Sequence, residues 1–254
     1  MKETKISVVI NTYNAQIYLE KVLDSVSQFD EIVVCDMEST DSTVSIAEKY
    51  HCKIVTFPKA EHKSAEPART FAIQSATSPW ILVVDADEIV PENLRKALYQ
   101  HISQEHAAEG LYIPRTNLFM GKYMHCAFPD YQLRFFIREG TTWPPYVHTF
   151  PMINGRTEKL PKDKSLAFIH LANDNIRTII EKDNRYSDND VEKKAKKNYG
   201  IGALIWRPIW RFFKCYLLEG GFKDGTRGLI YALQKGQYQF FLVSKIIEKR
   251  LSHE

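Results

Sequence analysis

The stretch ILVVDADEIVPENL, residues 81–94, places four apolar residues directly before three acids. Its apolar run begins at Trp80, and a continuous run of this kind is typical of a strand buried on both faces of a sheet. Residues 91–103 follow with Pro91 in the first turn of a helical pattern. The stretch therefore predicts a buried strand that ends in carboxylates and leads into a helix.

The same alternation of strand and helix patterns fills the first hundred residues. Strands are predicted at 6–12, 31–37, 53–58 and 80–87, and helices at 16–29, 39–51, 66–78 and 91–103. This order predicts an α/β fold with a mainly parallel sheet flanked by helices. Ligands bind beyond the carboxyl ends of the strands in such sheets. The polar residues at those ends are Thr12, Tyr13, Asn14, Asp36, Asp85 and Asp87.

Composition and charge exclude several classes of protein. The chain has 254 residues and a formal net charge of +3, whereas a nucleic-acid binder relies on a large excess of Lys and Arg. Its four cysteines form no CxxC pair, and scattered cysteines are typical of a reducing compartment. We find neither a signal-peptide pattern nor the roughly 18 apolar residues that span a bilayer. These features predict a cytoplasmic protein that does not bind nucleic acid.

Asp85 and Asp87 are two residues apart, so on an extended chain their carboxylates point the same way. Two such charges repel each other unless a partner neutralises them. Mg²⁺ or Mn²⁺ prefers carboxylate oxygens and leaves coordination positions for phosphate. The pair therefore suggests either a metal site that holds a diphosphate or a solvated loop. Glu88 fits the second reading better, as an acid that caps the next helix.

Three blocks, ISVVINTYN, EIVVCDMESTDST and PARTFAIQSATSPWILVVDADE, together resemble the family 2 glycosyltransferases, which have the GT-A fold. The order and spacing of the blocks match that family over about the first hundred residues. The resemblance implies transfer of a sugar from a nucleotide diphosphate donor, usually with inversion, using Mg²⁺ or Mn²⁺. The block PDYQLR and the aromatic tail are similar to enzymes of bacterial lipopolysaccharide core synthesis, which implies a hexose and a glycan or glycolipid acceptor.

The resemblance also implies a division of the chain. A GT-A catalytic domain is expected over residues 1–175, with a nucleotide-binding half at 1–105 and an acceptor half at 106–175. Residues 110–170 read as short strands and loops, and residues 181–198 as a charged, polar stretch. The tail from residue 222 has a helical pattern. A helical C-terminal extension is therefore expected over residues 176–254.

Roles for single residues follow from the same resemblance. Nucleotide-sugar binding is implied for Thr12, Tyr13, Asn14, Asp36, Arg69, Asp85, Gln132 and Arg134. Metal binding is implied for Asp85, Asp87 and His170. Met37 stands where many members have a second acid that contacts the base, so recognition of the base is left open. Surface or capping roles remain the alternatives for several of these residues, and a core role for His170.

An inverting transfer needs a general base that takes the proton of the acceptor hydroxyl. Asp130 precedes a strand-like alternation and matches the family's acid on the acceptor side. The related triplet V-H-E reads Val147-His148-Thr149 here, so its acid is missing. Asp130 is therefore the predicted base and His148 the alternative. The missing acid also leaves open a weak or inactive nucleotide-sugar-binding protein, and a sugar nucleotidyltransferase is a further alternative.

Residues 201–221, IGALIWRPIWRFFKCYLLEGG, combine aromatic and basic side chains. On a helix from about Ile205 to Leu218 the aromatic residues share one face, and Arg207, Arg211 and Lys214 lie on another. Such a helix either lies in a membrane interface or packs on the catalytic domain. A proline is tolerated in the first turn of a helix, which is where we expect Pro208. Peripheral contact with the inner face of the cytoplasmic membrane is thus one expectation.

Overall fold

The computed structural model describes residues 5–60, 62, 64–145, 149–172, 176–194 and 199–252. Its contacts divide the chain into two compact units. Unit 1 comprises residues 1–116 and 129–171, and unit 2 comprises residues 117–128 and 172–254. Unit 2 thus differs from the expected extension by including residues 117–128. The functional division at residue 175 stays a prediction, because these units are defined by contacts alone.

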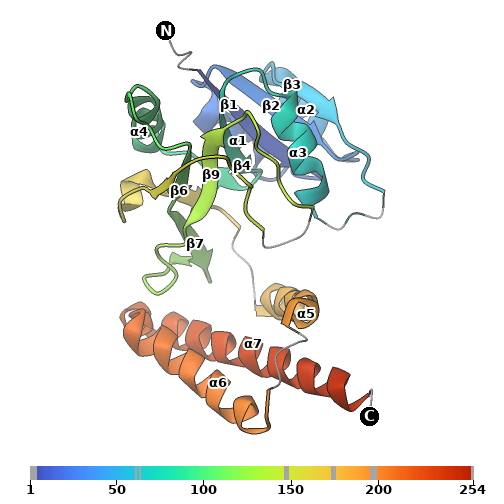
Figure 1. The fold of residues 1–254 in the computed structure, drawn as a ribbon, viewed down its shortest axis with the longest axis vertical. Coiled ribbons are helices and arrows are strands. Elements are labelled where there is room, and N and C mark those ends of the chain that lie inside the picture. Colours follow the sequence, from blue (N-terminus) through green and yellow to red (C-terminus); the bar gives the residue numbers. More distant parts are fainter. Residues whose placement is uncertain are drawn as a thin grey trace. The chain divides into compact units, whose positions relative to one another are not determined.

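Unit 1 is built on a seven-stranded sheet with the order β10-β6-β9-β4-β1-β2-β3 (Figure 1). Strands β1, β2, β3 and β4 are mutually parallel, and β9 runs antiparallel to both β4 and β6. The four predicted strands are confirmed: each begins at the predicted residue, and the last three end one or two residues early. The strands are β1 (Ile6–Thr12), β2 (Glu31–Asp36), β3 (Lys53–Thr56), β4 (Trp80–Asp85), β6 (Gly110–Ile113), β9 (Gln132–Ile137) and β10 (Thr157–Lys159).

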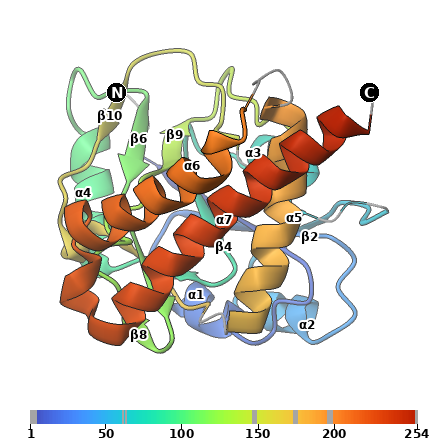
Figure 2. The ribbon, with the colours of Figure 1, turned by 90° about the horizontal axis from the view of Figure 1, so that it is seen from below.

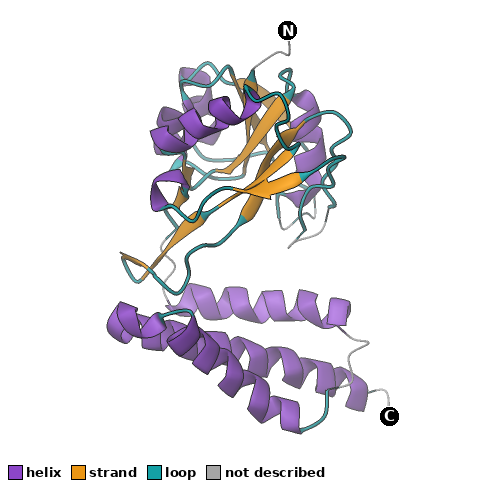
Figure 3. Cartoon of the chain, turned by 60° about the vertical axis from the view of Figure 1, so that its left-hand side comes forward, coloured by secondary structure: helices purple, strands orange, loops and turns teal. Residues whose placement is uncertain are grey.

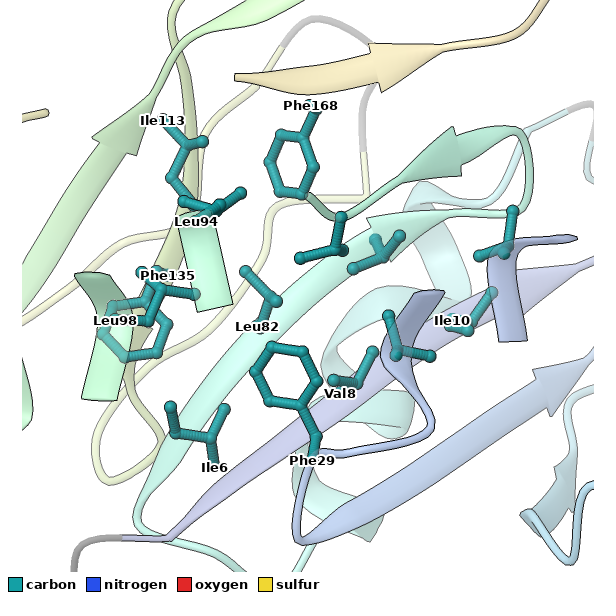
Figure 4. Packing of buried hydrophobic residues seen from close by; sticks show 14 of the residues in the cluster. Ile6, Val8, Ile10, Phe29, Leu82, Leu94, Leu98, Ile113, Phe135 and Phe168 are labelled. Atoms are coloured by element: carbon teal, nitrogen blue, oxygen red, sulfur yellow. The ribbon is translucent and has the colours of Figure 1, made fainter. Parts of the chain in front are cut away.

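Helices cover both faces of this sheet, which explains the uninterrupted apolar runs. Alternate residues of β4 serve opposite faces: Leu82 packs with α1 (Leu19–Val26), α2 (Thr43–Lys49) and α4 (Glu92–Ile102), as Figure 4 shows in part. Ile81 and Val83 pack instead with α3 (Glu66–Ser75). Because side chains alternate along a strand, Asp85 continues the row of Ile81 and Val83. The end of β4 therefore presents this carboxylate on the α3 side.

A second sheet has the order β5-β11-β7-β8. Its strands are β5 (Glu88–Ile89), β11 (Phe168–His170), β7 (Arg115–Phe119) and β8 (Lys122–Tyr123), and a 3-10 turn (η1, Lys164–Leu166) precedes β11. Strand β5 pairs antiparallel with β11, with His170 opposite Glu88. The segment after β4 therefore lies beside His170, which is about eighty residues further along the chain.

The described residues of unit 2 form the long helices α5, α6 and α7 (Figures 2 and 3). Helix α7 packs against both α5 and α6. The predicted helical C-terminal extension is confirmed, and its first helix, α5, includes much of the stretch 181–198 that reads as charged and polar. The elements are α5 (Ile176–Lys194), α6 (Gly202–Phe213), a π-helical turn (η2, Lys214–Leu218), a 3-10 turn (η3, Gly221–Asp224) and α7 (Gly225–Leu251). None of the described helices combines the length and the apolar character needed to cross a bilayer.

Pro208 lies inside α6, so its expected place in the first turn was wrong. A proline there removes one hydrogen bond to the preceding turn. Helix α7 approaches closely at this point, because a Cβ atom on Gly236 would lie only 2.9 Å from the carbonyl oxygen of Pro208. Pro208, a residue that weakens a helix, is thus accommodated in α6 at the point where α6 packs closely on α7.

Candidate active site

Two arginines hold Asp85 at the end of β4. Arg69 of α3 donates from Nη2 to Oδ1 at 2.8 Å, and Arg134 of β9 donates to Oδ1 and Oδ2 at 3.1 and 2.6 Å. Burial opposes ionisation of Asp85, but the charges of Arg134 and Arg69 outweigh it and hold its pKa well below the usual range. Asp85 therefore stays ionised and fixes the position of both guanidinium groups.

The indole of Trp143 lies against both arginines. Its ring centroid is 4.6 Å from Cζ of Arg69 and 5.5 Å from Cζ of Arg134. Nε and Nη1 of Arg69 and Nε1 of Trp143 are buried without a hydrogen-bond partner among the described residues, and so are both polar side-chain atoms of Asn11. Asn11 is the register partner of Asp85 on β1. Unpaired buried donors are costly, so this corner of the sheet suits a polar or anionic ligand.

Asp87, in the connection between β4 and β5, meets His170 at the end of β11. Nε2 of His170 lies 3.2 Å from Oδ2 of Asp87, and the amide of Leu171 donates to the Asp87 carbonyl at 2.8 Å. Burial lowers the pKa of His170, but its hydrogen bond to Asp87 and the charge of that carboxylate outweigh burial and raise the pKa. A carboxylate and an imidazole so placed form an oxygen–nitrogen pair that suits a divalent cation.

The structure does not assemble the expected metal trio of Asp85, Asp87 and His170. Within the described ranges, no group of three or more His, Cys, Asp or Glu side chains is arranged to hold a metal ion. The reason is that both oxygens of Asp85 accept hydrogen bonds from arginine. Asp87 and His170 are thus candidate protein ligands by their proximity, and metal binding by Asp85 stays a prediction.

Arg115 connects two acids that come from different elements. It donates from Nη1 to Oε1 of Glu88 at 2.9 Å, and from Nε and Nη2 to Oδ2 of Asp130 at 3.0 and 2.7 Å. Glu88 is fully buried and also accepts from the amide of Asp85 at 3.1 Å. The expectation that Glu88 is a solvated capping acid was therefore wrong. Gln132 donates to Oδ1 of Asp130 at 2.9 Å, so this carboxylate is held from two sides.

Polar groups after β1 and β2 form a second cluster. Asp36 accepts from Oγ1 of Thr12 at 2.9 Å and from the amide and Oγ of Ser39 at 2.8 and 2.6 Å. Oγ of Ser39 in turn accepts from the amide of Asn14 at 2.9 Å, and Asn14 adopts a positive φ of 48°. The side chain of Tyr13 is 48% exposed next to them. Asn and Asp adopt such a backbone conformation more readily than most residues, which favours asparagine at this turn.

The structure thus brings most of the predicted site residues into hydrogen-bonded pairs within unit 1. His148 lies outside the described residues, while Thr149 donates from Oγ1 to the carbonyl of Pro144 at 3.2 Å. Sequence reasoning missed the residues that support the site: Asn11, Glu88 in its buried role, Arg115 and Trp143. Of these, Glu88 had a sequence signal, because it directly continues the Asp85-Ala86-Asp87 run.

The architecture is the GT-A fold. The chain is similar to the mannosyltransferase PcManGT from Pyrobaculum calidifontis, whose structure contains GDP-Man and Mn²⁺, with a TM-score of 0.52 at 17% identity over 92% of this chain and 73% of that chain. Residues 7–159 match the family model described as Glycosyl transferase family 2, and the chain belongs to this family. The protein is accordingly a glycosyltransferase.

Relatives are similar in sequence to this protein along nearly its whole length. The lipopolysaccharide core biosynthesis glycosyltransferase LpsC of Rhizobium meliloti is 25% identical, covering 96% of this chain and 92% of that protein. An uncharacterised glycosyltransferase of Rickettsia conorii is 26% identical, covering 97% and 91%. Residues 1–349 of TarS from S. aureus, solved with UDP-GlcNAc, have a TM-score of 0.50 at 18% identity, covering 95% and 82%. That last likeness concerns the fold alone.

Proposed function

We propose that the protein is a metal-dependent, inverting hexosyltransferase that uses a nucleotide diphosphate sugar and acts on a cell-envelope glycan, of the lipopolysaccharide core type. The relative LpsC supports the acceptor class, and the GDP-Man and Mn²⁺ of the mannosyltransferase structure support the donor class and the metal. The observation that carries the proposal lies at the end of β4. Asp85 is held there by two arginines, and two residues further Asp87 pairs with His170.

The donor would occupy the carboxyl edge of β1, β2 and β4. The cluster of Thr12, Asn14 and Asp36 would meet the nucleoside, with the exposed ring of Tyr13 beside it. Nε and Nη1 of Arg69 have no hydrogen-bond partner among the described residues. Arginine matches phosphate oxygens with its planar fork, so these donors suit a diphosphate.

Asp87 and His170 would hold the divalent ion, with diphosphate oxygens as further ligands. An oxygen–nitrogen set favours Mn²⁺ over Mg²⁺, because Mg²⁺ prefers oxygen ligands. When bound there, the ion offsets negative charge that develops on the departing diphosphate. Nε2 of His170 and Oδ2 of Asp87 lie 3.2 Å apart, and a bound ion would replace the hydrogen bond between them.

Asp130 would act on the acceptor side. Its carboxylate receives the proton of the attacking hydroxyl, which attacks the anomeric carbon opposite the leaving diphosphate and so inverts its configuration. Arg115 and Gln132 orient this carboxylate through three hydrogen bonds. Its side chain is 32% exposed, which leaves it accessible to an acceptor.

Replacement of Asp87 by asparagine is expected to weaken Mn²⁺-dependent binding of a nucleoside diphosphate by about tenfold or more, because the ion loses its charged ligand. Isothermal titration with UDP or GDP, with and without Mn²⁺, measures the effect. His170→Ala should weaken the same Mn²⁺ dependence. The exposed Asp163, replaced by asparagine, is the matched control and should bind as the unmodified protein does. Unchanged Mn²⁺ dependence in Asp87→Asn would refute this metal site.

The proposed function itself is tested with UDP-, GDP- and ADP-linked sugars and a lipopolysaccharide core acceptor in the presence of Mn²⁺. We expect one donor class to support transfer, with a product whose anomeric configuration, read by NMR, is opposite to that of the donor. Retained configuration would exclude the inverting mechanism. Saturable donor binding without any transfer would instead favour a nucleotide-sugar-binding protein, the reading left open by Thr149.

A further inference from the structure

The outward side of α6 is apolar. Exposed residues recur in neighbouring pairs four positions apart, along α6 and the π-helical turn that follows it, and none of the residues of α6 is buried. Ile205 is 66% and Trp206 61% exposed. A helix at the surface of a soluble protein normally turns polar side chains to water. We call this inverted surface the apolar face; it consists of Ile205, Trp206, Ile209, Trp210, Phe213, Leu217 and Leu218.

A cavity of about 490 Å³ in unit 2 is lined by members of this face together with charged groups. The two indoles stack on each other, with ring centroids 5.6 Å apart. The cavity is positively charged, because three cations share it with one acid. The lining includes Trp206, Trp210, Arg207, Arg211, Lys214 and Glu219.

The charged groups of the cavity are only partly paired. Nη1 of Arg211 and Nζ of Lys214 lie 2.8 and 4.0 Å from the same oxygen of Glu219. Arg207 donates from Nη2 to Gln239 at 2.8 Å, while its Nε is buried and has no hydrogen-bond partner among the residues the structure describes. A buried donor of this kind is stabilised by an acceptor oxygen. The cavity is thus suited to an anionic group that carries several oxygens.

We infer that the apolar face and its cationic cavity form a docking site for an anionic phospholipid bilayer. Tryptophan side chains favour the level of the lipid headgroups, and apolar side chains beside them enter the acyl boundary. Arginine and lysine next to the indoles then meet the lipid phosphates. This combination of inverted exposure and positive charge at one helix favours a lipid surface over an apolar protein partner. The inference does not depend on the proposed transfer reaction.

Co-sedimentation of the full chain with phosphatidylcholine vesicles, with and without phosphatidylglycerol, tests the inference. We expect binding that is stronger on the anionic vesicles and weakens with added salt. The double variant Trp206→Ser/Trp210→Ser should bind at least about tenfold more weakly, since two large apolar groups are lost. Lys214→Gln should lower binding to anionic vesicles by about fivefold and leave binding to phosphatidylcholine unchanged.

A matched pair of variants separates this face from general surface hydrophobicity. Ile205→Ser should weaken binding, whereas Ile17→Ser, at a residue of unit 1 that is 75% exposed, should not. Brominated phosphatidylglycerol should quench the tryptophan fluorescence of the unmodified protein. This measurement does not depend on whether the variants fold. Absence of vesicle binding, or equal binding by the double variant, overturns the inference. So does a dimer in solution that Ile205→Ser dissociates, because a second copy would then cover the face.

Discussion

Asp130→Asn is expected to lower kcat for sugar transfer by about 10² to 10⁴-fold, the usual contribution of a positioned general base. Asparagine preserves the shape of the side chain, and its single oxygen can still accept a hydrogen bond from Arg115 or from Gln132, but it cannot take a proton. Donor affinity should change much less than kcat, because the nucleotide cluster and the Asp87–His170 pair keep their own side chains and charges. Transfer rates at saturating donor, together with titration of a nucleoside diphosphate, measure the two quantities separately.

The pH dependence gives this prediction a second readout. In the unmodified enzyme, kcat should fall at low pH as the carboxylate becomes protonated, and Asp130→Asn should lose that acidic limb. Asp163→Asn, which changes an exposed acid in the same unit, should keep both the rate and the profile. A rate for Asp130→Asn close to that of the unmodified enzyme would exclude Asp130 as the base and leave His148 as the alternative base.

Asp85→Asn is expected to destabilise unit 1 by about 3–5 kcal/mol, the range found when one partner of a buried ion pair is removed. The side chains of Arg69 and Arg134 are each only 7% exposed, so asparagine would leave two guanidinium charges poorly solvated and without their shared carboxylate. Urea unfolding followed by far-UV circular dichroism measures the loss, with Asp163→Asn as the control. A loss below about 1 kcal/mol would show that the arginines are stabilised without Asp85.

The pH sign of this effect follows from the lowered pKa of Asp85. A carboxyl group whose pKa is lower in the folded than in the unfolded chain stabilises the fold fully above its unfolded value, near 3.9. That stabilisation disappears progressively as the pH falls towards the lowered folded pKa. The stability difference between the unmodified protein and Asp85→Asn should therefore be constant near neutral pH and shrink below about pH 4.

The fold of the first hundred residues was predictable from their pattern of apolar and polar residues. Continuous apolar runs such as Ile81–Val84, bounded by caps and prolines, indicate strands that are covered on both faces. Because such strands are parallel, the polar residues at their ends lie at one edge of the sheet. This logic located Asp36, Asp85 and Asp87 before any coordinates. Arg134 was implied by the resemblance instead, and in the structure it lies on the face of β9 that carries Phe136 and packs with α3.

The partners of these residues were not predictable, because they depend on contacts between distant segments. Nothing near Arg115 in the sequence indicates that it bonds Glu88 and Asp130, 27 and 15 residues away. The engagement of Asp85 by arginines, which removes it from the expected metal trio, is likewise a tertiary effect. Helix α5 falls within the predicted helical extension, but its packing against α7 depends on a few positions such as Val191, which the polar pattern of the stretch does not single out.

The guanidinium group of Arg115 links the two sides of the proposed reaction, because it bonds both Glu88 and Asp130. In the proposed mechanism, Glu88 belongs to the segment that carries Asp87, on the leaving-group side, while Asp130 would receive the proton of the incoming hydroxyl. One guanidinium group would thus set the separation between the two ends of the in-line displacement. Evolution towards a bulkier sugar or a different hydroxyl would then have to adjust this bridge as well.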